Sequence, residues 1–222
     1  MPRDLDIERW RRRDHYQFFR TYERPFYNLC ADADVTELHG HTKRAGISFF
    51  AASLYAALRA ANEVEEFRYR IRPHGVIVHD VVHAGSTVLN DDETFSFCYF
   101  DFHPEFREFS AGVQSALEEH RRRRDVLEPQ DYRDDLIHFS VIPWISFTGL
   151  THARRNDPAD SVPKIVFGKY RGGDALKMPV SVEVHHALMD ALHVARFLDR
   201  FQRICDAAPT EIGNPTDGSP RA

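Results

Sequence analysis

The chain has 222 residues, of which 42% are hydrophobic and 28% charged, and its formal net charge is −5. That length suits one hydrophobic core, the negative charge gives no general attraction to nucleic acid or to an anionic membrane, and no run approaches the roughly 20 apolar residues of a membrane span. The first residues carry alternating charges without an apolar signal, and Cys30, Cys98 and Cys205 form no disulfide or zinc pattern, so we expect a soluble, cytoplasmic protein.

Apolar residues recur at helical spacing in four segments of the chain. The spacing predicts helices near residues 14–22, 47–62, 104–124 and 187–205. The last segment has a buried face marked by residues three and four apart, namely Leu188, Leu192, Ala195, Leu198 and Phe201. Residues 208–222 are rich in Pro, Gly and polar side chains, so we expect a single domain over residues 1–207 and a flexible tail after it.

Runs of β-branched and aromatic residues, separated by turn residues, predict strands. These runs occupy residues 67–72, 75–89, 94–102, 137–150, 164–171 and 178–186. Two hairpin turns are expected, at Pro73-His74-Gly75 and at Gly172-Gly173-Asp174. Because several neighbouring strands have no helix between them, the sequence favours an α+β fold with a mixed, largely antiparallel sheet and helices on one side.

The last predicted strand runs directly into His185-His186-Ala187-Leu188-Met189-Asp190. Histidine suits general-base catalysis because its ordinary pKa lies near neutrality, and a helix that began near His186 would place Asp190 on the same face. A single histidine at a strand end is more often a packed or surface residue than a catalyst, so this second interpretation stays open on the residues alone. A metal site of His186, Asp190 and His193 is a third, although the spacing lacks the His-Glu-x-x-His core of helix-borne zinc sites.

The segment from Val182 to Leu198 resembles the signature of the chloramphenicol acetyltransferases, His-His-x-x-x-Asp-Gly followed by an aromatic-His-Val-x-Arg stretch. That signature is shared more loosely with the acyltransferase cores of 2-oxo-acid dehydrogenase complexes. Other motifs resemble the family's in the same order over residues 8–205: Trp10-x-Arg12-Arg13-x-His15, Glu66-Phe67-Arg68, Glu93-Thr94-Phe95-Ser96, Pro143-Trp144-Ile145-Ser146-Phe147 and Gly168-Lys169-Tyr170.

The resemblance implies the two-layer α/β sandwich of CoA-dependent acyltransferases, assembled as a homotrimer with active sites between subunits. It implies transfer of an acetyl group from acetyl-CoA to a hydroxyl group, without a metal, and it makes chloramphenicol the leading acceptor. The partners expected are therefore a small-molecule acceptor and two further copies of the chain.

The resemblance also assigns roles to individual residues. His186 matches the catalytic base, Asp190 the motif aspartate, and Arg12 the N-terminal arginine that pairs with this aspartate. Ser140 matches the serine that donates a hydrogen bond to the developing oxyanion, and Lys169 matches a lysine that meets the coenzyme phosphate. Positions that line the acceptor pocket or its approach match Phe18, Thr87, Phe95 and His138.

Several residues depart from the family pattern. Ala191 replaces the glycine after the motif aspartate, and we expect it to be tolerated because alanine is favourable at a helix start. Val166 replaces a threonine that supports the transition state through water. Ser48 replaces a phosphate-binding lysine, for which Lys43 or Arg44 could compensate.

Polar and charged residues also stand at positions that are apolar in the drug-binding enzymes: Glu23, His152, Arg154, Asp160 and Lys164. Charges beside an apolar aryl ring are costly unless they are paired. Two alternatives to chloramphenicol acetylation follow. One is acetyl transfer to a more polar hydroxyl acceptor, such as a sugar or polyol. The other is an acyltransferase-like oligomer that binds a ligand without catalysis.

Overall fold

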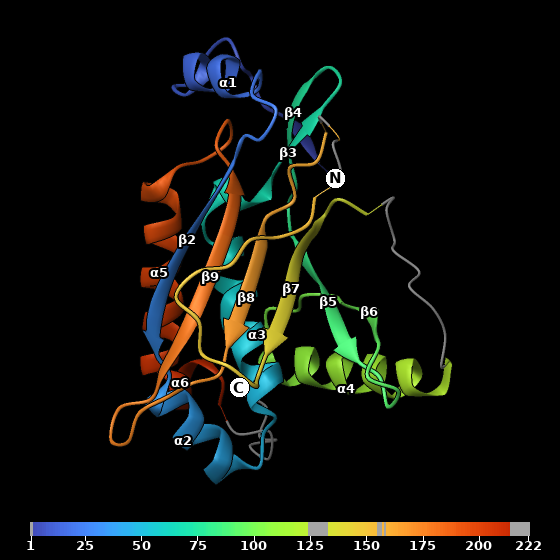
Figure 1. Cartoon of the computed structure of the whole chain (residues 1–222), viewed down its shortest axis with the longest axis vertical. Helices are drawn as coiled ribbons and strands as arrows, with labels where there is room; N and C mark the ends of the chain where they lie inside the picture. The colour runs from blue at the N-terminus through green and yellow to red at the C-terminus, as the bar shows by residue number, and fades with distance from the viewer. Residues whose placement is uncertain (1, 124–132, 155–156, 158, 214–222) are drawn as a thin grey trace, which may run out of the picture.

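A six-stranded mixed sheet forms the centre of the computed structural model, which describes residues 2–123, 133–154, 157 and 159–213. The strand order is β2-β9-β8-β7-β5-β6 (Figure 1), where β7 runs parallel to both of its neighbours and the other pairs are antiparallel. The strands are β2 (Phe26–Asp34), β5 (His83–Leu89), β6 (Phe95–Phe100), β7 (Leu136–Ile142), β8 (Lys164–Gly168) and β9 (Lys177–His185).

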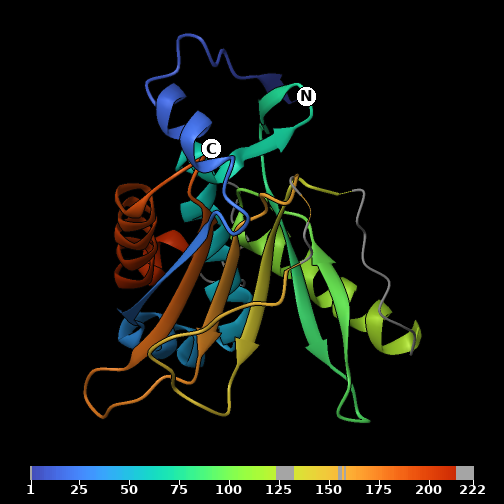
Figure 2. The ribbon, with the colours of Figure 1, turned by 45° about the horizontal axis from the view of Figure 1, so that its top comes forward.

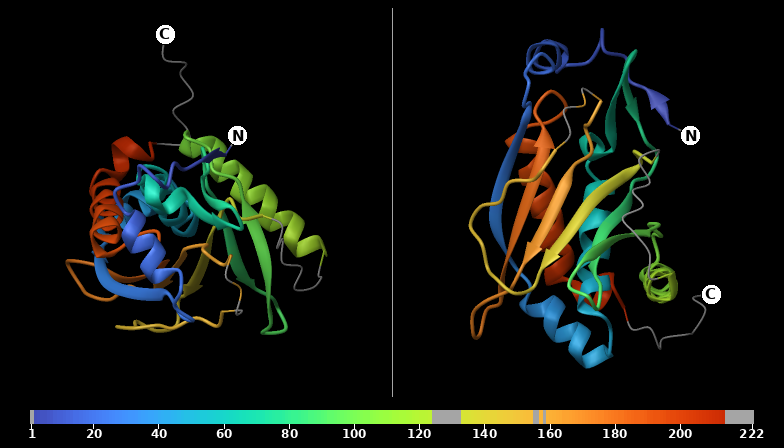
Figure 3. Two further views of the ribbon diagram at one scale, coloured as in Figure 1. Left: turned by 90° about the horizontal axis from the view of Figure 1, so that it is seen from above. Right: turned by 45° about the vertical axis from the view of Figure 1, so that its right-hand side comes forward.

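Helices cover one face of this sheet, as the view from above in Figure 3 shows. They are α2 (Thr36–Ala45), α3 (Phe49–Asn62), α4 (Phe106–Arg123), α5 (Ala191–Asp206) and the short α6 (Ala208–Glu211), with a 3-10 helix, η1 (Glu65–Arg68), after α3. The main apolar core lies between the two layers, where residues such as Phe139, Phe167 and Val182 meet the alanine-rich α3. The α+β sandwich expected from the sequence is confirmed.

A second, three-stranded sheet lies at the same end of the molecule as α1 (Arg13–Phe19), as Figure 2 shows. Its strands are β1 (Arg3–Asp4), β4 (Gly75–Val78) and β3 (Tyr69–Arg72), in that order. A small apolar cluster joins Tyr16 of α1 and Tyr69 of β3 to Ala187 and Leu188, which follow β9. This cluster fixes the N-terminal segment against the turn that contains His186.

Between β7 and β8, residues 143–154, 157 and 159–163, here called the cross-sheet segment, cross the sheet face opposite the helices (Figure 3). The sequence predicted strand up to residue 150, but β7 ends at Ile142. Pro143 follows directly and has no N–H to donate to a ladder. This segment therefore covers the sheet rather than extending it.

The elements that the sequence did not predict include strand β2 and helix α2. In β2 the strand pattern is weakened by Asn28, Asp32 and Asp34, residue types that are depleted in strands, and it is an edge strand. The predicted strand over residues 75–89 is in fact two strands, β4 and β5, which belong to different sheets.

The end of the described chain is not a loose tail. Residues 208–211 form α6, and Ala208 and Ile212 are buried in the main core. The expectation of a tail from residue 208 was based on composition and overlooked the apolar anchor that Ile212 provides. Residues 214–222 lie outside the described residues. Within the described part of the chain, no helix is long and apolar enough to cross a membrane.

Candidate active site

The turn between β9 and α5 carries His186 and Asp190, the predicted catalytic base and the motif aspartate. Asp190 is the N-cap of α5, and its side chain accepts a hydrogen bond from the Leu192 N–H at 3.1 Å. His186 therefore precedes the helix, and the expected common helix face of His186 and Asp190 is wrong. Ala191 occupies the first helical position, as expected, and alanine is favourable in a helix.

Arg12 connects this turn to the N-terminal segment. Its Nη1 lies 2.5 Å from Asp190 Oδ2, and its Nη2 donates to the carbonyl oxygen of His186 at 3.2 Å. Burial alone would raise the pKa of Asp190, but the hydrogen bond and the charge of Arg12 lower it below its ordinary value. One guanidinium thus holds both ends of the turn.

The imidazole of His186 is held in one orientation and one tautomer. Its Nδ1 lies 3.3 Å from the carbonyl oxygen of Met189. A carbonyl only accepts, so Nδ1 carries the hydrogen and Nε2 keeps a free lone pair. Phe19 stacks on the ring with centroids 3.9 Å apart, and Tyr27 lies against it at 4.7 Å. Nε2 is therefore presented as a proton acceptor by a ring that its neighbours keep from turning.

Phe19 and Tyr27 were not predicted as site residues. Phe19 follows the predicted Phe18 on α1, and Tyr27 belongs to the unpredicted strand β2. Recognition of Phe26-Tyr27 as the start of a strand paired with residues 177–185 would have brought Tyr27 beside His186. The Tyr27 hydroxyl is buried, and within the described residues it has no hydrogen-bond partner.

The two other histidines of this segment are occupied by protein contacts. His185 is buried and its Nδ1 accepts from the Ala187 N–H at 3.2 Å; burial, with the nearby Arg154, lowers the pKa of His185 to about 4. His193 accepts from the Asp190 N–H through Nδ1 and faces Glu66 through Nε2. Among the described residues no group of three side chains is arranged to hold a metal ion.

Ser140 lies on β7, on the sheet face opposite the helices. Thr87 of β5 donates a hydrogen bond to Ser140 Oγ at 3.3 Å, so the hydrogen of Ser140 stays available for another acceptor. His138 lies two residues earlier on the same face. Its ring reaches solvent, yet desolvation by the surrounding protein, helped by Lys164, lowers the pKa of His138 to about 4, and the ring is neutral at pH 7.

One chain does not bring His186 and Ser140 together. Through the strand register, Ser140 aligns with Val166 of β8 and then with Ser181 of β9, five residues before His186. With about 3.3 Å per residue and about 4.8 Å per strand, the two side chains are on the order of 15–20 Å apart. The structure therefore contains two half-sites, one around His186 and one around Ser140.

The remaining predicted residues divide between these places. Phe18, 58% exposed, contacts Phe19 in the His186 half-site, and Phe95, 49% exposed, lies on β6 beside the strand of Thr87. Lys169 is exposed just after β8.

The chain just after Lys169 contacts helix α2. The neighbouring Tyr170 contacts His39 of α2 through its hydroxyl at 3.1 Å. The basic last turn of α2, with Lys43 and Arg44, belongs to the same helix. Ser48 is used as the N-cap of α3 and accepts from the Ala51 N–H. Lys43 and Arg44 are the cations nearest Ser48 in the sequence.

Three of the residues at the unexpected positions, His152, Arg154 and Asp160, form a cluster with Glu183, and Glu23 is exposed. Arg154 Nε donates to Glu183 at 2.5 Å and Nη1 to Asp160 at 2.9 Å, and His152 lies 3.2 Å from the other oxygen of Glu183. Burial alone would raise the pKa of Glu183, but its bonds to His152 and Arg154 lower it to about 2. The Lys164 ammonium donates to the carbonyl oxygen of Ala153.

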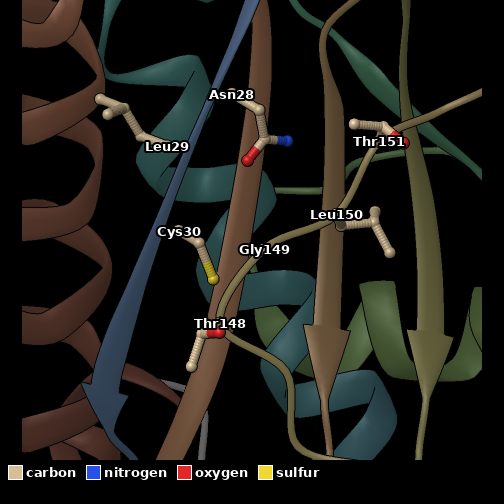
Figure 4. Close-up of a pocket in the computed structure, with 7 residues that line it drawn as sticks. All are labelled: Asn28, Leu29, Cys30, Thr148, Gly149, Leu150 and Thr151. Atoms are coloured by element: carbon tan, nitrogen blue, oxygen red, sulfur yellow. The ribbon is translucent and has the colours of Figure 1, made fainter.

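A shallow groove of about 490 Å³ lies between β2 and the segment that crosses the sheet (Figure 4). It is lined by Asn28, Leu29, Cys30, Thr148, Gly149, Leu150 and Thr151. Neither His186 nor Ser140 belongs to its lining, so it is not the candidate active site.

Solved structures share this fold. The cubic core of a pyruvate dehydrogenase multienzyme complex superposes with a TM-score of 0.62 at 20% identity, over 85% of this chain and 84% of that one. A solved chloramphenicol acetyltransferase superposes with a TM-score of 0.82 at 28% identity, over 92% of this chain and all of that one.

Sequence comparison names the family. The family model for chloramphenicol acetyltransferase matches residues 3–202. Chloramphenicol acetyltransferase 2 of Escherichia coli is 29% identical over 91% of this chain and 96% of its own length. The chain belongs to the chloramphenicol acetyltransferase family and is an enzyme of the O-acyltransferase class.

Proposed function

We propose that the protein transfers an acetyl group from acetyl-CoA to a hydroxyl group of a small-molecule acceptor, with His186 as the general base. The observation that carries the proposal is the fixed tautomer of His186, in which Met189 engages Nδ1 and leaves Nε2 free. Arg12 supports it by holding the His186 carbonyl and Asp190 at once.

The chemistry follows from the two half-sites. His186 Nε2 accepts the hydroxyl proton while the oxygen attacks the thioester carbonyl carbon. The Ser140 hydroxyl donates a hydrogen bond to the oxyanion of the tetrahedral intermediate. Collapse of this intermediate breaks the C–S bond, the CoA thiolate takes the proton back from the imidazolium, and His186 returns to its neutral form. Lys169 would bind a phosphate of the coenzyme as a point charge.

The proposal includes a homotrimer in which His186 of one subunit faces Ser140 of the next. Its support is the separation of the two residues within one chain, which is far beyond hydrogen-bond reach of a common substrate. A closed cyclic assembly repeats one interface and would form an equivalent site at each boundary. Such an enzyme would act in the cytoplasm, where acetyl-CoA is available.

Chloramphenicol is the leading acceptor because the relatives carry its name. Phe18, Thr87 and Phe95 would line its pocket or the approach to it. A more polar hydroxyl acceptor is the second candidate. Its support is the neutral His138 ring and the Lys164 ammonium, which lie side by side on the face that carries Ser140 and offer hydrogen bonds there.

Release of the CoA thiol tests the proposal, with acetyl-CoA and a panel of acceptors that includes chloramphenicol, sugars and polyols. We expect release with at least one acceptor and a loss of at least about 10²-fold in His186→Ala. Wild-type protein that is silent with every acceptor would contradict acetyl transfer and favour a binding protein. A strong preference for chloramphenicol would end the polar-acceptor candidate.

A further inference from the structure

The buried guanidinium of Arg154 is one of the contacts that join the cross-sheet segment to the sheet, beside that of His152 with Glu183. Its nitrogens donate to Glu183 on β9, to Asp160, and to the carbonyl oxygen of Val162. The side chains of Arg154 and Glu183 are only 11% and 9% exposed. A planar, forked guanidinium can satisfy all of these acceptors at once, which an ammonium cannot do.

The same guanidinium lies over the ring of Phe26, with its carbon 3.5 Å from the ring centroid. Phe26 is the first residue of β2 and is paired with His185, whose ring it meets edge-on at 5.0 Å. Arg154 therefore packs against the residue at which the start of β2 pairs with the end of β9.

The two residues that flank Phe26 both hold His186. The carbonyl oxygen of Pro25 accepts the His186 N–H at 2.6 Å, and the Tyr27 ring lies against the imidazole. A shift of Phe26 would move the backbone anchor and one ring wall of His186 together. The contacts thus run without a gap from Arg154 through Phe26 to the imidazole.

We propose that Arg154 is a positioning residue for His186 and acts through Phe26. The inference rests on the proposed role of His186 as the base. A buried ion pair adds little net stability compared with apolar residues of similar volume, because desolvation offsets the attraction between the charges. The Arg154 cluster therefore serves to select one position of Phe26 more than to stabilise the fold.

The test separates positioning from stability with a double variant. Arg154→Met alone leaves Glu183 buried without its main partner, and this variant can fail to fold. Arg154→Met combined with Glu183→Gln removes the more buried of the two stranded charges and leaves the more exposed one, Asp160, while Phe26 still loses its cation. Phe26→Leu removes the ring and keeps the ion pairs. The matched control is Lys177→Met, which breaks another cross-strand pair between β9 and β2, to Asp34.

We expect the double variant and Phe26→Leu to fold and to lose kcat by about 10- to 100-fold, since small misplacement of a reacting group has effects of this size. KM for acetyl-CoA should stay within about twofold, as Arg154 contacts no proposed coenzyme residue. The control should keep the wild-type kcat. A folded double variant or Phe26→Leu with wild-type kcat would overturn the proposal.

A second readout does not need an acceptor. The ¹⁵N chemical shifts of the His186 ring report which nitrogen carries the hydrogen, and we expect the single Nδ1–H form of the wild type to become a mixture in both variants. Unchanged shifts would overturn the positioning role. If the wild type transfers no acetyl group while the variants still change these shifts, the proposed function fails and the inference stands.

Discussion

At the scale of single residues, the candidate chemistry depends on which polar hydrogens already have a hydrogen-bond acceptor within the protein. Met189 engages Nδ1 of His186, so that Nε2 can only accept. Thr87 donates to Ser140, so that the Ser140 hydroxyl can donate onward. The two functional groups therefore have opposite and complementary roles, a proton acceptor and a hydrogen-bond donor, before any substrate binds.

Replacement of Ser140 by alanine tests the donor role. We expect Ser140→Ala to lower kcat by about 10²- to 10³-fold, because an oxyanion would lose one preorganised donor. KM should change little, since the interaction forms mainly in the transition state. Steady-state kinetics with the best acceptor of the panel would measure both constants.

Thr87→Val is the matched control for this experiment. It removes the neighbour that donates to Ser140 but leaves the Ser140 hydrogen in place, so its loss of kcat should be clearly smaller. Equal losses in the two variants would show that the polar pair matters as a unit and that Ser140 has no separate donor role.

At the scale of elements, Asp190 has two roles that substitution can separate. As N-cap it binds the Leu192 N–H, and as an anion it binds Arg12. Asn caps helices about as well as Asp does, while alanine costs about 1 kcal/mol at this position. Asp190→Asn should therefore keep the cap of α5 and weaken only the link to Arg12.

We expect urea unfolding to rank the proteins as wild type, Asp190→Asn and Asp190→Ala, in order of falling stability, with about 1 kcal/mol between the two variants. Both variants should lower kcat, since each frees the turn that holds His186. Equal stability of the two variants would show that the cap does not contribute. A wild-type kcat in Asp190→Asn would show that the ion pair between Arg12 and Asp190 does not contribute to catalysis.

The same elements show how far the sequence predicted the fold. Strong periodicity placed α3, α4 and α5 within a few residues, and the hairpin turn at Pro73-His74-Gly75 joins β3 to β4 as expected. The strand β2 was missed because its polar residues suit an edge rather than a core. Whether such a segment forms a strand depends on long-range pairing, here between β2 and β9, and not on local propensity.

At the scale of the whole molecule, the resemblance anticipated part of the grouping around the candidate site, and the residues alone anticipated none of it. Arg12 and Asp190 are 178 positions apart and form an ion pair, which only the resemblance anticipated. Arg154 was expected to be a costly charge, and its pairing with Glu183 depends on the path of the cross-sheet segment. Phe19 and Tyr27 contact the His186 ring through tertiary packing, which no local sequence pattern predicts.

The separation of His186 from Ser140 makes a prediction that belongs only to the assembly. If each site takes its histidine from one subunit and its serine from the next, a mixed oligomer of His186→Ala and Ser140→Ala chains contains some sites with both native residues. With equal expression and random assembly, about a quarter of all sites are intact in this way. Coexpressed and copurified chains should therefore recover about a quarter of the wild-type kcat, although each variant alone is nearly inactive.

The control for this experiment is coexpression of His186→Ala with the double variant His186→Ala/Ser140→Ala, which leaves no native histidine and should stay inactive. Differently tagged chains would show by tandem purification that mixing has occurred. If verified mixed oligomers of the two single variants are no more active than the parents, His186 and Ser140 do not meet across a subunit boundary. Because the two residues are on the order of 15–20 Å apart within one chain, that result would also show that they do not act together on one substrate.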